Sequence, residues 1–225
     1  GLRGPLLPRG ATFTLHKGEI VGLAGLTGSG RTETLRCLFG LDPVLGGQIR
    51  MKSGVGMGFL SEDRKAEGLA MKLSLRENIT LPSLRSLGPW GTIRPASERE
   101  AALSAMKDLD LKYQDLDQEA ETLSGGNQQK TAIARLRLQD ADILMLDQPT
   151  RGVDIGSRAR IYELIDRRVR EGRAVLLASD DLGELLGLCD RISVMRNGEL
   201  APPLPADTLD LPALHGLIQV RERAA

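Results

Sequence analysis

Hydrophobic residues along this chain alternate between short apolar runs and helical repeats. Three apolar runs are typical of buried parallel strands, at 19–25, 143–146 and 174–179. Helical spacing follows these runs at 32–39, from about 156 to 170, and at 181–188. Strands that alternate with helices predict a mainly parallel sheet covered on both faces, so the expected fold class is α/β.

Shorter strand patterns accompany this alternation. Alternating or apolar stretches predict further strands at 11–15, 47–51 and 57–60. The segments 192–195 and 199–200 flank Asn197-Gly198, a dipeptide that favours the two-residue turn of a β-hairpin. We therefore expect a small antiparallel β portion beside the parallel sheet.

The stretch from 62 to about 122 differs from the rest of the chain because it is charged, interrupted by prolines and mostly helical in pattern. Ser74-x-x-Glu77 and Ser97-x-x-Glu100 both fit the capping box that begins many helices. These features predict a helical subdomain inserted into the α/β core.

Composition excludes several function classes. The chain has 30 basic and 30 acidic residues, so no charge excess favours nucleic acid or an anionic membrane surface. No apolar run approaches the roughly 20 residues that span a bilayer, so a role at a membrane needs a separate partner. Cys37 and Cys189 lie in apolar helical contexts and are expected to be buried free thiols. Trp90 is expected to pack within the helical subdomain.

A glycine-rich turn joins the apolar run at 19–25 to the helical repeat that follows it. Its residues are Gly25, Leu26, Thr27, Gly28, Ser29, Gly30, Arg31 and Thr32. Strand, turn and helix in this order form the context of a P-loop, whose backbone N–H groups and helix N-terminus bind phosphate. Thr32 would place its hydroxyl on Mg²⁺, whereas Arg31 stands where the general motif has lysine. A glycine-rich turn without a ligand is the alternative interpretation.

The apolar run at 143–146 ends in a carboxylate. Asp147 would lie beside the phosphate loop and help to order Mg²⁺. Taken alone, an aspartate that ends a strand is more often a turn residue or a helix cap than a metal-site residue. Gln148 follows, and a glutamine can orient a water molecule but cannot accept its proton at neutral pH.

The most specific string in the chain is Leu123-Ser124-Gly125-Gly126-Asn127-Gln128-Gln129-Lys130. It resembles the signature peptide of ABC-type ATPases, and its spacing from the P-loop and from Asp147 is similar to that of ABC nucleotide-binding domains along almost the whole chain. Four strings narrow the resemblance to one group within this family: GLTGSGRTE, SEDRKAEGL, LSGGNQQK and DQPTRGVDIGSRARIYELI. They resemble the second nucleotide-binding domain of bacterial ribose, galactose and xylose importers.

The resemblance implies one ABC ATPase domain over 1–225, with a P-loop NTPase core and a helical subdomain at about 62–122. It implies ATP and Mg²⁺ as cofactors, and a fragment of a longer polypeptide with two fused domains. The signature residues would complete the site of a partner ABC domain, in the same polypeptide or in a homodimer. Gly152, Val153 and Asp154 resemble the D-loop, which contacts that partner.

Three further positions depart from the general ABC pattern. Gln148 stands where the catalytic glutamate is expected, Glu62 aligns with the Q-loop glutamine, and Asp180 aligns with the switch histidine. A carboxylate close to the γ-phosphate would be repelled, so Asp180 is also expected to be the N-cap of the helix at 181–188. The resemblance therefore implies a slow nucleotide site in this chain.

Two stretches are shorter than in the resembled family. The segment 48–58 lacks part of a β-segment, and the start near Gly1 omits a first strand. Positions 1–12 hold no aromatic residue that could stack on adenine, so the base contact stays unassigned.

The implied partners are an integral membrane permease and, indirectly, a periplasmic or extracellular sugar-binding protein, with no nucleic acid. The implied location is the cytoplasmic face of the cell membrane. Two alternatives are a regulatory ATP-binding module without turnover and a soluble ABC ATPase of DNA repair or translation. The latter would need long coiled-coil heptads between Arg31 and Ser124, or basic linkers, and the sequence has neither.

Overall fold

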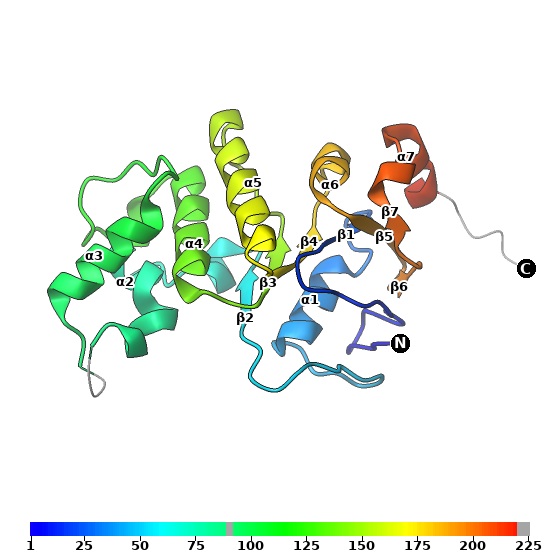
Figure 1. The fold of residues 1–225 in the computed structure, drawn as a ribbon, viewed down its shortest axis with the longest axis horizontal. Helices are drawn as coiled ribbons and strands as arrows, with labels where there is room; N and C mark the ends of the chain where they lie inside the picture. Colours follow the sequence, from blue (N-terminus) through cyan, green and yellow to red (C-terminus); the bar gives the residue numbers. More distant parts are fainter. Residues whose placement is uncertain (89–91, 220–225) are drawn as a thin grey trace, which may run out of the picture. The chain divides into compact units, whose positions relative to one another are not determined.

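The computed structural model describes residues 1–88 and 92–219 (Figure 1). Trp90 lies outside this range, so its expected packing is not tested. The chain divides into two compact units. Unit 1 contains 1–57, 142–148 and the residues from 166 onward, and unit 2 contains 58–141 and 149–165.

Unit 1 is built on a parallel sheet. Its strands are β1 (Ile20–Gly25), β3 (Ile143–Asp147), β4 (Ala174–Ala178) and β5 (Arg191–Arg196), in the spatial order β3-β4-β1-β5. All residues of β1 and β4 are buried, as expected for the central strands of a sheet covered on both faces. The α/β prediction is confirmed.

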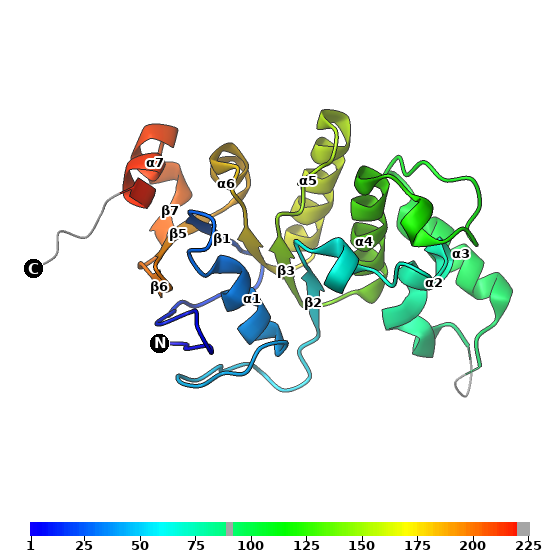
Figure 2. The same cartoon turned by 180° about the vertical axis from the view of Figure 1, so that it is seen from behind.

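Helices cover this sheet from both sides. In both views, α1 (Arg31–Phe39) lies on one side of the strands of unit 1, and α6 (Leu182–Leu188) and α7 (Leu211–Gln219) lie on the other (Figures 1 and 2). Cys37 and Cys189 are buried free thiols, as predicted, and burial raises the pKa of both.

The predicted antiparallel portion lies at the edge of the sheet. Strand β6 (Glu199–Leu200) pairs with β5 around Asn197 and Gly198, whose φ angles are 48° and 84°. Positive φ at both central residues is the condition for a type I′ turn, so the hairpin prediction is confirmed. A further short strand, β7 (Leu204–Pro205), also pairs with β5 in the antiparallel sense.

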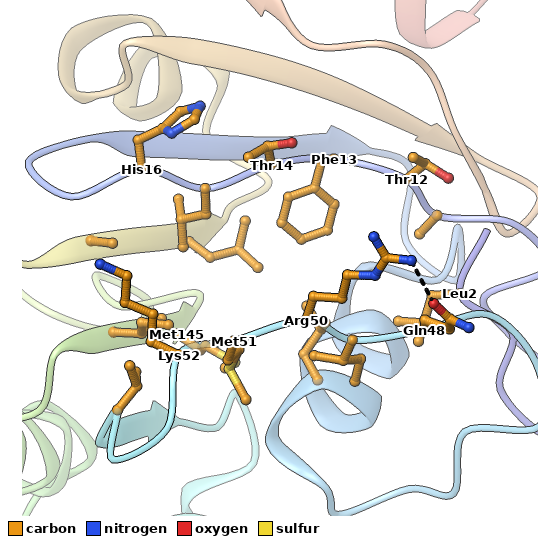
Figure 3. Close-up of a pocket in the computed structure, with 18 of the residues that line it drawn as sticks. Leu2, Thr12, Phe13, Thr14, His16, Gln48, Arg50, Met51, Lys52 and Met145 are labelled. Carbon is orange, nitrogen blue, oxygen red and sulfur yellow. Dashed lines mark hydrogen bonds between the residues drawn. The ribbon is translucent and has the colours of Figure 1, made fainter.

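The strands predicted at 11–15 and 47–51 do not form. Ala11 makes one isolated bridge with Leu2, and the second segment has no ladder partner in the described part of the chain. Both segments instead line a hollow of about 780 Å³ beside β3 and β4, called here the N-terminal cavity (Figure 3). On one wall of it, Arg50 donates a hydrogen bond of 3.0 Å to Gln48, two residues earlier on the same segment (Figure 3). An alternating pattern supplies one apolar face, but a strand also needs the free edge of a neighbouring strand with which to form backbone hydrogen bonds.

Unit 2 is mostly helical. Helices α2 (Leu75–Thr80), α3 (Pro95–Met106) and α4 (Gly125–Gln139) pack against one another (Figure 2). Strand β2 (Met57–Leu60) begins at the boundary between the units, and α5 (Ile155–Arg170) begins in unit 2 and ends in unit 1. The described residues also include short helical segments: the π-helical turn Arg64–Gly68 and the 3₁₀ turns Leu81–Ser86, Ala120–Thr122 and Ala206–Thr208.

One of the two predicted capping boxes is present. Ser74 and Glu77 bond each other's backbone N–H groups at the start of α2. Ser97 does not begin α3, because Pro95 occupies the first helical turn and its fixed φ starts the helix earlier. Along residues 1–88 and 92–219, no helix is both long and apolar enough to cross a membrane.

Candidate functional site

The glycine-rich turn of unit 1 forms an open cradle between β1 and α1. Gly28 and Gly30 have φ angles of 76° and 112°, and Thr27 and Gly28 are exposed. A Cβ on Gly25 would lie 2.5 Å from the Met195 carbonyl oxygen, so only glycine fits the start of the turn. Gly30 caps α1 without a side chain, which leaves the first N–H groups of the helix available to an anion.

Two buried oxygen atoms beside this cradle have no hydrogen-bond partner among the described residues. They are Ser29 Oγ and Asp147 Oδ2. Asp147 is 1% exposed, and burial raises its pKa to about 6 although the Thr32 hydroxyl and the Arg31 charge act in the opposite direction. Buried polar atoms normally have partners, and hard oxygen atoms are what Mg²⁺ and phosphate groups bind. These residues therefore fit a magnesium–phosphate ligand.

No cluster of three or more metal-binding side chains occurs in the part of the chain that the structure describes. This observation is compatible with Mg²⁺, which commonly takes one or two protein carboxylates and completes its octahedron with phosphate and water oxygens. Thr32 and Asp147 are the residues that would hold it.

Arg31 does not point freely into the cradle. Its side chain is buried, and its Nη1 donates a 2.7 Å hydrogen bond to the Ser179 carbonyl oxygen. Its Nη2 pairs with the carboxylate of Asp180, whose backbone N–H donates a 3.2 Å hydrogen bond to Gln148 Oε1. The residues predicted for the P-loop lysine, switch and catalytic positions thus form one connected network, in which the Asp180 carboxylate balances the arginine charge. Sequence reasoning missed Ser179, because a backbone acceptor leaves no signal in residue type.

The predicted role of Asp180 as a helix cap is wrong. Helix α6 begins at Leu182, and Asp181 caps it by accepting a 3.1 Å hydrogen bond from the Glu184 N–H. Asp180 lies one residue before the cap, and its side chain is 50% exposed. The carboxylate is therefore free of the helix and reaches Arg31 instead.

Gln148 has an unusual backbone conformation. Its φ angle is 53°, and its N–H donates a 2.9 Å hydrogen bond to the Ala178 carbonyl oxygen. A left-handed conformation is uncommon for a residue other than glycine, asparagine or aspartate and often marks a functional turn. Here it turns the chain directly after the carboxylate that ends β3.

The signature residues of unit 2 form the start of a long helix. Ser124 caps α4, and its hydroxyl oxygen lies 3.1 Å from Asn127 Nδ2. Ser124 and Gly125 are exposed, whereas Leu123 is buried and Gln128 bonds the carbonyl oxygens of Ala120 and Leu123. Buried contacts thus anchor the turn from the core side, while Ser124 and Gly125 leave the positive end of the helix dipole open to solvent. Such an end can bind an anion.

The segment before α5 is also ordered by side chains. Asp154 accepts hydrogen bonds of 2.9 Å from the Ser157 N–H and 2.8 Å from the Ser157 hydroxyl. These bonds, with Lys130 3.5 Å away, lower the pKa of Asp154 to about 2. Asp154 therefore caps α5 as a carboxylate at neutral pH.

Residues 8–151 match the ABC transporter family, which is more than half of the chain. The chain belongs to this family. The ribose import ATP-binding protein RbsA of Bacillus licheniformis is 42% identical to this ABC domain over 86% of the chain and 42% of its own length. Ribose import ATP-binding protein RbsA 3 of Rhizobium meliloti is 39% identical over 93% of the chain and 44% of its own length. The ABC domain thus spans less than half the length of these curated relatives.

Solved structures support the same assignment. The dimeric ATP-binding cassette MJ0796, in a post-hydrolysis state bound to ADP and Pi, is 25% identical and has a TM-score of 0.74 over 86% of this chain and 88% of its own. The ATP-binding subunit of an ABC transporter has a TM-score of 0.77 at 20% identity over 97% of this chain and 99% of its own, which supports the fold. The chain thus has the fold of an ABC ATPase.

The structure sorts the predicted site residues of the ABC domain into two groups. Unit 1 brings together the phosphate loop, Asp147, Gln148 and Asp180. Unit 2 holds Glu62, the signature residues and the D-loop, and Glu62 pairs there with Arg151. None of these predicted residues lines the N-terminal cavity (Figure 3).

Proposed function

We propose that this ABC domain is one of two nucleotide-binding domains that power a carbohydrate importer. Its phosphate loop binds MgATP but turns it over slowly, and its signature completes a faster site on the partner domain. The observation that carries this proposal is the contrast between the two units. The signature keeps the full family pattern at an open helix end, whereas three substituted positions around the phosphate loop bond one another.

The chemistry of the local site supports slow turnover. Arg31 donates hydrogen bonds to the Ser179 carbonyl oxygen and to the Asp180 carboxylate. A γ-phosphate must therefore compete with that carboxylate for the positive charge of Arg31. Gln148 can orient a water molecule through its amide but cannot take the proton that attack on phosphorus releases. Bound Mg²⁺ would supply charge neutralisation of the phosphate oxygens, with Thr32 and Asp147 as its protein ligands.

The signature has the geometry of a phosphate-binding group that acts on another molecule. Ser124 and Gly125 are exposed at the start of a 15-residue helix, where a hydroxyl and several N–H groups can bind an anion. Donors that are fixed in place before the reaction stabilise developing charge without reorganisation. ATP held by a partner domain would therefore join the two domains, and its hydrolysis would release them.

The relatives support the remaining parts of the proposal. Their names describe ribose import, and they are more than twice as long as the matched part of this chain. The partner ABC domain is accordingly in the same polypeptide, or it is a second copy of the chain. The pair would act on a membrane permease at the cytoplasmic face of the membrane, with sugar delivered by an external binding protein.

The test compares two substitutions in the assembled transporter ATPase. Ser124→Arg blocks the signature and is expected to lower ATP turnover about 100-fold, the size of effect seen when a fixed transition-state donor is lost. Gln148→Glu supplies a base to the local site only and is expected to leave the total rate nearly unchanged. Steady-state phosphate release and sugar uptake into vesicles measure both effects.

Ser104→Arg, at an exposed serine of α3, is the matched control for added bulk and charge. If Ser124→Arg behaves like Ser104→Arg while Gln148→Glu strongly raises the rate, the division of labour between the sites is reversed. If none of the variants changes a rate that is itself zero with the partner present, the chain is a regulatory nucleotide-binding module instead.

A further inference from the structure

Arg64 makes a set of contacts in unit 2 that the proposed nucleotide chemistry does not use. It belongs to the SEDRKAEGL string and is half-buried. Its Nη1 lies 3.0 Å from the Gly125 carbonyl oxygen, 3.3 Å from Gln129 Oε1 and 3.3 Å from the Arg151 carbonyl oxygen. One guanidinium therefore joins the signature helix to the loop that precedes α5.

Two glycines lie against this guanidinium. A Cβ on Gly125 would lie 3.7 Å from Arg64 Nη2, and a Cβ on Gly152 would lie 3.7 Å from both terminal nitrogens. Gly152 also has a φ of 73°, and a Cβ on Gly126 would lie 3.2 Å from the Gly152 carbonyl oxygen. Distances of 3.7 Å are ordinary van der Waals contacts, so the guanidinium packs directly against one signature glycine, Gly125, and against Gly152.

Further contacts reinforce the same junction. Gln129 is 2% exposed and donates a 2.7 Å hydrogen bond to the Pro149 carbonyl oxygen. Glu62, two residues before Arg64, pairs with the side chain of Arg151. The segment at 62–64 is therefore tied to the loop at 149–151 by two charged side chains.

Helix stability does not account for this arginine. A cation beside a helix N-terminus opposes the helix dipole, which favours negative charge there. The position is favourable for a different purpose, because the positive charge adds to the attraction of the signature N–H groups for an anion. Hydrogen bonds from a charged donor also hold the loop and the helix end in one relative orientation.

We propose that Arg64 is a positioning residue that sets the orientation of the signature and the D-loop together. A displacement of the segment 62–68 is then transmitted to Ser124 as a rigid movement. The inference rests on the proposed function, because it assumes that the signature acts on ATP held by a partner domain.

The test uses Arg64→Gln in the assembled ATPase and in this chain. Turnover is expected to fall about tenfold with little change in KM for ATP, as the loss of one charge-assisted hydrogen bond allows. Amide hydrogen exchange at 125–127 and 151–154 is expected to accelerate, while the Kd of this chain for MgATP stays unchanged because Arg64 is not part of the phosphate loop. Arg64→Lys keeps the charge and is expected to recover part of the rate.

Arg99→Gln, at an exposed arginine of α3, is the matched control. If Arg64→Gln matches this control in turnover and exchange while Ser124→Arg still lowers turnover about 100-fold, the positioning role is wrong and the proposed function stands. If exchange accelerates over all of unit 2, or if Arg64→Lys recovers nothing, Arg64 is merely structural. If Ser124→Arg itself has no effect, the proposed function fails before the role of Arg64 is reached.

Discussion

At the scale of single residues, the phosphate loop is notable for where its arginine is held. Lysine at this position acts as a compact point charge, whereas the planar fork of arginine favours two directed bonds. Arg31 makes them to Ser179 and Asp180. Because Asp180 is half exposed, water screens this ion pair and its contribution to stability is modest. The pair can therefore open when a phosphate group competes for the arginine.

We expect Asp180→Asn to raise the affinity of this chain for MgATP about threefold to tenfold. The substitution releases Arg31 and removes a negative charge from the neighbourhood of the phosphates. The expected gain in affinity corresponds to the interaction energy of one partly screened charge pair. Isothermal titration with ATP and Mg²⁺ measures the effect. Asp207→Asn, at an exposed aspartate of the same unit, is the control. Weaker binding by Asp180→Asn alone would mean that this carboxylate contacts the metal rather than the arginine.

Asp147 differs from Asp180 in its exposure to solvent. It is almost fully buried, and its raised pKa reports the cost of keeping a carboxylate away from water. Such a cost is typical of a site that is completed by a cation, since an added positive charge removes it. The local structure therefore gives up stability at a position where a metal ion would bind.

At the scale of elements, helix ends connect the fold to the proposed function. Helix α4 begins after Ser124, α5 begins after Asp154 and α6 begins after Asp181. Each start is held by a short polar side chain, and only the first is also a signature residue. The hydrogen bond that caps the start of each helix therefore also sets the direction of the first N–H groups of that helix.

The cap at Asp154 predicts a pH dependence. Its pKa is lowered to about 2 in the folded chain from an ordinary 3.8, so the charged cap stabilises the fold above pH 3.8. This contribution is expected to disappear as the pH falls through about 2. Urea unfolding can be followed from pH 5 down to the lowest pH at which the chain stays folded. The difference in free energy of unfolding between wild type and Asp154→Ala should become smaller as the pH falls.

Two controls separate the charge from other effects. Asp154→Asn can cap the helix without a charge. The difference in free energy of unfolding between Asp154→Asn and Asp154→Ala should therefore not depend on pH in this range. Glu163→Ala removes an exposed carboxylate from the same helix. A gap between wild type and Asp154→Ala that stays constant with pH would contradict the proposed ionised cap.

At the scale of the whole molecule, the chain has two units with different parts of the proposed chemistry. Phosphate-loop residues lie in unit 1, and signature and D-loop residues lie in unit 2. A domain that closed an ATP site by itself would need both groups on one nucleotide. In the proposed head-to-tail pair, each domain would supply one group to each site.

We expect MgATP to protect only one unit when the chain is alone. Amide exchange at 25–32 should slow when MgATP is added and recover when EDTA removes the metal, whereas exchange at 124–127 should not change. Addition of the partner ABC domain with ATP should then protect 124–127 as well. Protection of the signature by MgATP without any partner would show that the chain acts on its own nucleotide, which the proposal does not allow.

Much of this protein follows from its sequence. Continuous apolar runs marked the central strands, because a strand buried on both faces has no polar position. Asn197-Gly198 marked the hairpin, because few residues accept two successive positive φ angles. The phosphate loop and the signature are also predicted from contiguous residues, since their chemistry depends on neighbouring backbone groups and therefore on contiguous residue types.

Tertiary structure decided what depends on residues distant in the chain. The segments 11–15 and 47–51 alternate correctly but have no neighbouring strand, and pairing is not written in either segment. Asp180 was expected to cap a helix and instead bonds Arg31, 149 residues away in sequence. Arg64 likewise meets Gly125 and Arg151 only through folding. Local pattern determines elements and short motifs, whereas the partner of a long charged side chain depends on what folding brings within its reach.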